Sequence, residues 1–194
     1  IGIKKGDRVA IMLHNCPEFL DLFLACSRIG AICVPINFRI TGPELDYFIK
    51  NCRPRLFVHG KDFIDVVGSL NLRSYLPPMV IAVVGEYLSN GMVFNYRAET
   101  QKFDKQKAFL TRSIGPADPE EPQVIMYTSG TTGKPKGAVL SHRKTFFNCL
   151  NADIFFKLHF SDIMLIFLPL FHSGGLFIQA APIFYKGATI ILHE

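Results

Sequence analysis

Short apolar stretches alternate with amphipathic stretches through the first part of the chain. Residues 7–13 are apolar apart from their start, and comparable stretches recur at 31–35, 55–60 and 79–84. Between them, apolar side chains recur at intervals of three and four residues, which is the spacing of one helix face. Near-continuous apolar strands separated by such helices are typical of a mostly parallel sheet that helices cover on both faces. We therefore expect an α/β fold built from βαβ units.

Polar residues indicate where two of these helices begin. Asn15 stands three residues before Glu18, and Thr41 stands three residues before Glu44, so each pair has the spacing of an N-terminal capping box. Gly30 follows the first amphipathic stretch and is suited to the left-handed turn that ends many helices. We expect a helix to begin at each pair, and the first helix to end at Gly30.

The pattern weakens after residue 84 and resumes near residue 120, which divides the chain into three regions. We interpret 1–84 as a first βα region, 85–119 as a polar connection with one helix near 97–110, and 120–194 as a second βα region. The elements expected in that third region are strands at 123–129 and 162–170, a helix at 143–156, and a final helix and strand. Ser141 is a suitable N-cap for the helix at 143, so His142 and Arg143 are interpreted as helix-start residues.

Residues 163–185 carry no charged side chain and are numerous enough to span a bilayer. Prolines, glycines and polar side chains interrupt them, which favours a strand, a turn and a short buried helix over one continuous helix. A membrane-anchored protein stays as an alternative, and peripheral membrane contact and the oligomeric state are left open. The chain begins with Ile1 and shows no signal-peptide pattern, so we expect a piece of a longer cytoplasmic protein.

Composition excludes several classes of protein. The net charge is +5, from 21 Lys and Arg against 16 Asp and Glu, and the basic residues form only a loose cluster between 134 and 144. Nucleic-acid binding calls for a basic face with interleaved aromatic residues, so it is not expected. The five cysteines show no C-x-x-C spacing, which argues against a disulfide framework and a zinc site. Cys26 and Cys33 lie in apolar stretches and are expected in the core.

Residues 127–137 read YTSGTTGKPKG and form the most polar stretch of the chain, directly after an apolar strand. Glycines at 130, 133 and 137 permit positive φ angles and close approach of the backbone to a ligand. Four hydroxyl side chains add hydrogen-bond donors, and Lys134 and Lys136 add positive charge. Donors, cations and an open backbone suit a polyphosphate. The stretch does not fit the G-x-x-x-x-G-K-[ST] loop, because position 135 is proline.

Residues 126–143, MYTSGTTGKPKGAVLSHR, resemble the AMP-binding signature of the adenylate-forming superfamily, which includes acyl-CoA synthetases, aryl-CoA ligases, luciferases and peptide-synthetase adenylation domains. Residues 24–58 resemble the helix–strand region of that family in its acyl-CoA ligase form, and residues 168–176, LPLFHSGGL, resemble the segment that borders the acid pocket. The resemblance spans residues 1–194. It identifies the chain as part of the large N-terminal domain, with the C-terminal domain absent.

The resemblance implies a two-step reaction on a carboxylic acid. The carboxylate attacks the α-phosphorus of ATP to give an acyl-adenylate and pyrophosphate, with Mg²⁺ as the metal ion, and the thiol of CoA then displaces AMP. Such chemistry depends chiefly on positioning and charge neutralisation. The expected parent protein is therefore an ATP-dependent acid–CoA ligase of fatty or aryl acids, as in fatty acid metabolism.

By motif position, the resemblance also implies site residues. The residues expected to hold the β- and γ-phosphates are Thr128, Ser129, Gly130, Thr131, Thr132, Gly133, Lys134 and Lys136. The Thr128 hydroxyl would also help to place Mg²⁺, and His172 would border the carboxylate and the α-phosphate as the catalytic residue. Outside this context, a lone histidine near a strand end is more often a turn or core residue. Gly174 and Gly175 are interpreted either as helix-start or as pocket-wall residues.

The family carries further motifs that these 194 residues do not contain: a Tyr-Gly-x-Thr-Glu segment whose Glu binds Mg²⁺, a ribose-binding Asp and a C-terminal Lys. We therefore expect this chain alone to be catalytically inert, with weak nucleotide binding at most. A peptide-synthetase-type adenylation domain is the nearest alternative, and residues 34–45, VPINFRITGPEL, argue against it. A nucleotide-binding module without chemistry is the alternative from another class.

Overall fold

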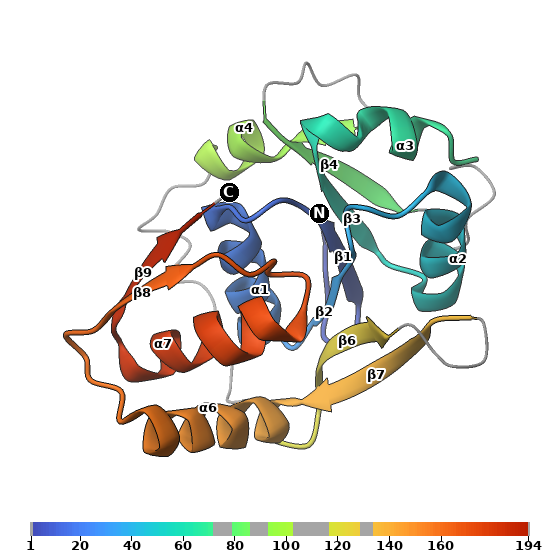
Figure 1. Cartoon of the computed structure of the whole chain (residues 1–194). Coiled ribbons are helices and arrows are strands. Elements are labelled where there is room, and N and C mark those ends of the chain that lie inside the picture. Colours follow the sequence, from blue (N-terminus) through green and yellow to red (C-terminus); the bar gives the residue numbers. More distant parts are fainter. Residues whose placement is uncertain (1, 72–78, 86–92, 103–116, 129–133, 194) are drawn as a thin grey trace.

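The computed structural model describes residues 2–71, 79–85, 93–102, 117–128 and 134–193. Their strands form one sheet in the order β5-β4-β3-β1-β2-β6-β7 and a separate pair, β8-β9 (Figure 1). The strands are β1 (Arg8–Met12), β2 (Ile32–Pro35), β3 (Leu56–Gly60), β4 (Val80–Val84), β5 (Val93–Asn95), β6 (Pro122–Thr128), β7 (Lys136–Ser141), β8 (Ile163–Ile166) and β9 (Thr189–Leu192). The helices are α1 (Pro17–Ile29), α2 (Gly42–Cys52), η1 (Lys61–Phe63), α3 (Ile64–Gly68), α4 (Tyr96–Gln101), α6 (His142–Phe156), the π-helical η3 (Gly174–Ala180) and α7 (Ala181–Lys186).

The larger sheet is mostly parallel, as the apolar pattern predicts. Strand β1 pairs in parallel with both β2 and β3, and the parallel pairing continues to β6 on one side and to β4 and β5 on the other. Only β7 runs the other way, because it forms an antiparallel hairpin with β6. The α/β fold class is therefore confirmed, with one antiparallel edge strand.

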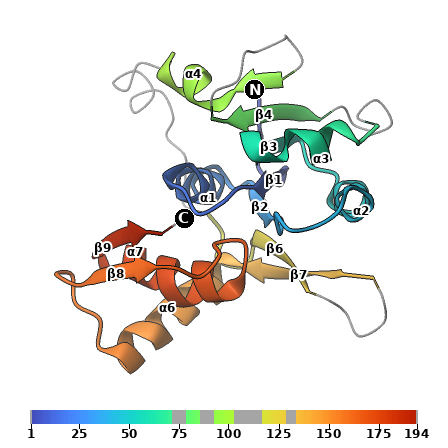
Figure 2. The same ribbon diagram turned by 45° about the horizontal axis from the view of Figure 1, so that its top comes forward.

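Helices cover both faces of this sheet, and the side chains of β1 point alternately to the two faces. Val9 and Ile11 belong to the buried cluster that contains the apolar side chains of α1, while Ala10 and Met12 belong to the cluster that contains those of α2. Successive side chains of a strand point to opposite faces, so a strand buried on both faces must be apolar throughout. Figures 1 and 2 show α1 on one side of β1 and β2, with α2 and α3 on the other.

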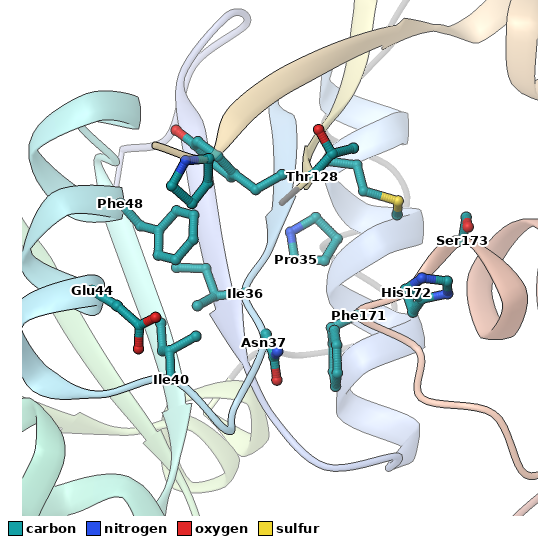
Figure 3. A pocket seen from close by; sticks show the side chains of 13 residues that line it. Pro35, Ile36, Asn37, Ile40, Glu44, Phe48, Thr128, Phe171, His172 and Ser173 are labelled. Carbon is teal, nitrogen blue, oxygen red and sulfur yellow. The ribbon is translucent and has the colours of Figure 1, made fainter. Parts of the chain in front are cut away.

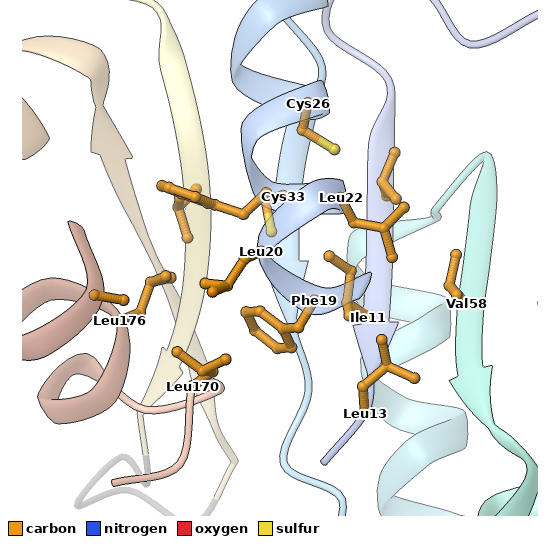
Figure 4. Close-up of a cluster of buried hydrophobic side chains, with 14 of the residues drawn as sticks. Ile11, Leu13, Phe19, Leu20, Leu22, Cys26, Cys33, Val58, Leu170 and Leu176 are labelled. Atoms are coloured by element: carbon orange, nitrogen blue, oxygen red, sulfur yellow. The ribbon is translucent and has the colours of Figure 1, made fainter. Parts of the chain in front are cut away.

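The C-terminal elements pack on the α1 side of the sheet. Leu170 and Leu176 share a buried cluster with Phe19 and Leu20 of α1 (Figure 4). Phe19, Leu170 and Leu176 are each at most 1% exposed. Burying one side chain of this size contributes about 2 kcal/mol. This contact brings the segment that contains His172 against the first sheet, although more than 140 residues separate it from α1 along the chain.

One of the two predicted capping boxes is confirmed. The carboxylate of Glu44 accepts hydrogen bonds from the backbone N–H and the hydroxyl of Thr41, at 2.7 and 2.8 Å, and α2 begins there. The prediction for Asn15 is wrong, because Cys16 is the N-cap residue of α1 and the Asn15 amide bonds to the C-terminal segment instead. Gly30 ends α1 with φ 71°, as expected.

Other predicted elements differ in extent. The helix expected near 97–110 begins at Tyr96 and its described part ends at Gln101, while residues 103–116 lie outside the described residues. The strand expected at 162–170 ends at Ile166, because residues 168–172 form a turn that Pro169 helps to fix. Residues 163–185 form β8, that turn, η3 and most of α7, which confirms the interpretation as strand, turn and buried helix. Across the described ranges, no helix is long and apolar enough to cross a membrane.

Candidate functional site

The polyphosphate-binding loop predicted from the sequence connects the two strands of the β6–β7 hairpin. Thr128, the last residue of β6, pairs with Lys136, the first residue of β7, and Tyr127 pairs with Gly137. Directly opposed residues in an antiparallel pair lie about 5 Å apart, so the Thr128 hydroxyl and the Lys136 stem start from neighbouring positions. The remaining loop residues proposed to bind phosphate lie outside the described residues: Ser129, Gly130, Thr131, Thr132 and Gly133.

Gly137 has a structural role that differs from the one expected. Its φ is not positive, which corrects the interpretation that it opens the backbone to a ligand. A Cβ at this position would lie 2.7 Å from Cγ2 of Ile125 and 3.4 Å from Cζ of Tyr127. Glycine is therefore needed because the cross-strand neighbours on β6 fill the space of a side chain.

Tyr47 of α2 holds the C-terminal side of the loop, although it lies outside the sequence motif. Its phenol donates a hydrogen bond to the carbonyl of Pro135 at 2.9 Å. The Lys134 ammonium lies 5.9 Å from the centroid of the Tyr47 ring, within the range of a cation–π contact. Sequence spacing gave no signal for this contact, because it joins elements that only the tertiary fold brings together.

Thr128 and His172 line the same cavity, as their assignment to one site requires. The cavity measures about 510 Å³ and opens beyond the carboxyl ends of β2 and β6, where ligands bind in open α/β sheets. Figure 3 shows Phe171 and His172 on one side of it, facing Glu44 and Phe48 of α2 on the other. The full lining consists of Pro35, Ile36, Asn37, Ile40, Glu44, Phe48, Met126, Tyr127, Thr128, Pro135, Phe171, His172 and Ser173.

The cavity combines an apolar wall with a few polar groups. Ile36, Phe48, Met126 and Phe171 supply apolar and aromatic surface. Polar atoms come from Asn37, Glu44, Tyr127, Thr128, His172 and Ser173. Such a lining suits a ligand with an apolar body and one polar reacting end. Burial raises the pKa of Tyr127 well above its ordinary value, so its phenol stays protonated and donates to the Asn51 side chain.

The orientation of His172 follows from two backbone contacts. The N–H of Gly174 donates to Nδ1 of His172 at 3.2 Å, and the backbone N–H of His172 donates to the Pro169 carbonyl at 3.0 Å. Because Nδ1 accepts a hydrogen bond, the neutral ring carries its proton on Nε2. The ring is exposed at the cavity, so Nε2–H is available as a donor toward a ligand.

Gly174 and Gly175 are helix-start residues, and neither lines the cavity. Both are buried, and η3 begins at Gly174. A Cβ on Gly175 would lie 2.3 Å from the carbonyl oxygen of Pro169 and 2.5 Å from that of Leu168. The helix start therefore packs directly on the turn that precedes His172, which only glycine permits.

A second cavity lies along the same edge of the sheet. It measures about 450 Å³ and is formed by the β1–α1 loop and the ends of β3 and β4. An aromatic cluster connects the walls of the two cavities. The ring centroid of Phe38 lies 4.4 Å from that of His14, which lines the second cavity. It lies 5.1 Å from the ring centroid of Phe171, which lines the first cavity. Glu18 also lines the second cavity and pairs with Arg97 at 2.6 Å.

The cysteines are thiols buried in the core or half-buried. The part of the chain that the structure describes contains no group of three or more His, Cys, Asp or Glu side chains placed to hold a metal ion. All five cysteines are free thiols, and burial raises the pKa of Cys26 and Cys52 to about 12. Cys26 and Cys33 are core residues, as predicted, at 3% and 0% exposure.

Comparisons with known proteins establish the family. The chain belongs to the AMP-binding enzyme family, whose model matches residues 1–194. It is 35% identical to indoleacetate–CoA ligase of Aromatoleum aromaticum, in an alignment that covers 99% of this chain and 36% of the relative. It is 32% identical to a feruloyl-CoA synthase of an Amycolatopsis species, over 100% of this chain and 35% of the relative. The chain thus spans about a third of the length of these relatives.

Solved structures agree with this assignment. The anthranilate CoA ligase AuaEII in complex with anthranoyl-AMP superimposes with a TM-score of 0.83 at 26% identity, covering 98% of this chain and 36% of that structure. ATP-bound MatB from Rhodopseudomonas palustris superimposes with a TM-score of 0.79 at 27% identity, covering 100% of this chain and 36% of that structure. The resemblance to adenylate-forming enzymes and their N-terminal fold is therefore confirmed.

Proposed function

We propose that this chain supplies the phosphate loop and one wall of the acid pocket of an ATP-dependent acid–CoA ligase. The observation that carries the proposal is the shared cavity of Thr128 and His172, which joins the polyphosphate loop to the segment assigned to the acid. The names of the relatives support it, since they are CoA ligases or synthases for indoleacetate, ferulate and crotonobetaine or carnitine.

In this proposal the loop neutralises and orients ATP. Lys134 and Lys136 approach the β- and γ-phosphates, with the backbone and hydroxyls of residues 129–133. Thr128 lies at the hairpin base and lines the same cavity as His172. Transfer to an acid carboxylate requires mainly that the reacting atoms be aligned and that negative charge be offset. His172 contributes by donating from Nε2–H to the carboxylate or to an α-phosphate oxygen.

Mg²⁺ fits this site as a substrate-bound ion. Thr128 presents one hard oxygen ligand at the cavity, and the Glu44 carboxylate is already bonded by Thr41. Mg²⁺ typically takes only one or two protein ligands and completes its octahedron with phosphate oxygens and water. When bound, it would offset charge on the phosphates, and Thr128 is the described residue that would contact it.

The acid is proposed to have an apolar body, either aryl or fatty. Phe48, Phe171 and Met126 line the cavity beside Ile36 and Ile40, and this surface favours an apolar body, because a charged body placed against it would lose hydration. CoA is proposed as the acyl acceptor. Two alternatives remain. One is a peptide-synthetase-type domain, which passes the acyl group to a carrier protein, and the other is a nucleotide-binding module without chemistry.

Nucleotide binding by this chain tests the site directly. We expect weak binding of MgATP, and a loss of roughly tenfold in affinity for Lys136→Gln, because one charge-assisted contact to phosphate is removed. Lys102→Gln is the matched control. Lys102 follows α4, beside the edge strand β5 at the opposite end of the sheet from β7, and pairs with Glu99 at 2.6 Å. Equal effects of the two substitutions, or no binding by the wild-type chain, would contradict the proposed site.

Catalysis is tested by acid-dependent ATP–pyrophosphate exchange. We propose that this chain alone is inert, because the Glu, Asp and Lys motifs that the family resemblance requires do not occur in it. The same chain extended to the length of its relatives should exchange pyrophosphate with an aryl or fatty acid and form a thioester only when CoA is added. Robust exchange by the 194 residues, or acyl transfer only to a carrier protein, would reject these assignments.

A further inference from the structure

Asn15 lies in the loop between β1 and α1, and it is one of the few buried polar residues, at 8% exposure. Its side-chain Nδ2 donates to the carbonyl of Leu168 and to the carbonyl of His193, both at 3.1 Å. Its Oδ1 accepts from the backbone N–H of Leu170 at 2.9 Å. Both N–H groups and the carbonyl oxygen of the amide are therefore bonded, all of them to backbone atoms at least 153 residues away.

These bonds act on the turn that leads to His172. Leu168 is held from both sides, because its carbonyl accepts from Asn15 and its N–H donates to Oε1 of the buried Gln179 at 3.2 Å. Leu170 is fixed by Asn15 and by burial in the core. The next fixed point is the hydrogen bond from the His172 N–H to the Pro169 carbonyl. From Leu168 to His172 the backbone therefore has little freedom to shift.

We propose that Asn15 is a positioning residue for His172: its amide sets the position of residues 168–172 relative to the first sheet, and so relative to Thr128 at the end of β6. The role of His172 in this inference rests on the proposed function, whereas the contacts of Asn15 do not depend on it. A primary amide suits the task because it offers two donors and an acceptor in one plane, which matches two carbonyls and one N–H. No charged or hydroxyl side chain of similar size offers that combination.

Asn15→Asp is the most direct test, because it keeps the size and the acceptor but removes both donors. The carboxylate would face the Leu168 and His193 carbonyls, which repel it. Asn148→Asp is the matched control. Asn148 also donates from its amide to a backbone carbonyl in the same C-terminal region, but that carbonyl belongs to Phe177 of η3, at 2.6 Å, and not to the turn at 168–172.

The readout is the His172 imidazole in ¹⁵N-labelled chain without ligand. In the wild type, long-range ¹H–¹⁵N spectra should show the neutral ring protonated at Nε2. In Asn15→Asp the ring signals should shift and the Nδ1 acceptor pattern should weaken, while the amide signals of β6 stay in place. Exchange of the Leu168 amide hydrogen should become roughly tenfold faster, as expected for loss of a net hydrogen bond in the segment. Asn148→Asp should change neither.

Unaltered His172 ring signals in a folded Asn15→Asp chain would overturn the proposal, whatever the chain does with ATP. If Asn15→Asp does not fold, Asn15→Ser carries the same expectation, because its shorter side chain cannot make the three bonds and adds no charge. Fast exchange of the Leu170 amide hydrogen in the wild type would also overturn it. MgATP titration of the same samples separates this result from the proposed function, since Asn15 does not line the Thr128 cavity.

Discussion

Tyr47 donates a hydrogen bond from its phenol to the backbone carbonyl of Pro135, at 2.9 Å and across 88 residues of chain. The bond links α2 to the C-terminal end of the phosphate loop, next to Lys134. Because Pro135 has no N–H and a restricted φ, its carbonyl is the main group by which a neighbour can hold this part of the loop. The loop is thus positioned by a helix that the sequence motif does not include.

Replacing Tyr47 with Phe should weaken MgATP binding without disturbing the fold. The ring stays, with its edge contact to Phe48, and only the bond to Pro135 is lost. We expect about a fivefold loss of affinity and a decrease of about 1 kcal/mol in the free energy of unfolding. Titration calorimetry and urea denaturation measure the two effects. Tyr185→Phe, on the exposed face of α7, should change neither, and an equal loss in that variant would reject the role of Tyr47.

The sequence predicted those features that local spacing determines. Thr41 and Glu44 form a capping box because both partners lie within one helical turn. Asn15 and Glu18 have the same spacing, yet Asn15 bonds to Leu168, Leu170 and His193 instead. The local pattern could not show this, because those partners reach Asn15 only when the C-terminal elements pack on α1.

The candidate site divides in the same way. The motif predicted Thr128 and His172, and the structure places both on one cavity. It did not reveal Tyr47, or that Gly137 is glycine because Ile125 fills the space beside it. Those two depend on which strands pair and which helix lies alongside. The apolar pattern predicted the parallel sheet but not the antiparallel pairing of Thr128 with Lys136.

Gly175→Ala should be strongly destabilising. The new methyl group would lie 2.3 Å from the Pro169 carbonyl oxygen and 2.5 Å from that of Leu168. Both oxygens belong to the backbone, so neither can rotate away as a side chain could. We expect a loss of about 3 kcal/mol in the free energy of unfolding, at the upper end for an overpacked site. Thermal and urea unfolding followed by circular dichroism measure it. Gly68→Ala is the control, because no atom lies within 4 Å of its added Cβ and its φ is not positive.

Stability should fall as the pH drops below about 6.5, and His59 contributes to that fall. Burial lowers the pKa of His59 from its ordinary 6.5, although its hydrogen bond to the Gly60 carbonyl acts in the opposite direction. The unfolded chain therefore takes up a proton at higher pH than the folded chain. Stability is complete above the unfolded pKa and is lost as pH falls from there toward the folded pKa.

The substitution His59→Gln removes this titration while keeping a side-chain donor. The free energy of unfolding measured between about pH 7 and pH 5.5 should therefore decline less steeply than in the wild type. His159→Gln is the control, because His159 is exposed and its ring bonds to Ser161, two residues further along the chain. Identical slopes for the wild type and His59→Gln would show that His59 does not contribute.

Large apolar side chains are exposed along the C-terminal elements, and they predict self-association of this chain. Phe155 is 80% exposed, Ile154 69%, and Phe160 and Ile163 67% each. The adjoining β8–β9 pair is a parallel sheet of only two strands, a kind that is normally buried on both faces. An exposed apolar surface of this kind is typical of a site that binds another apolar surface. At sufficient concentration, a second copy of the chain provides that surface.

Sedimentation velocity over a range of protein concentrations tests this expectation. The wild-type chain should shift toward larger species as concentration rises. The double variant Phe155→Lys with Ile163→Lys should shift the midpoint of association at least tenfold higher, a change of about 1.4 kcal/mol, because it removes two exposed apolar groups and adds like charges. A control with one added lysine on the other side of the molecule, Thr100→Lys on α4, should associate like the wild type. A wild-type chain that stays monomeric at every concentration, or a control that dissociates as the double variant does, would show that this surface does not drive association.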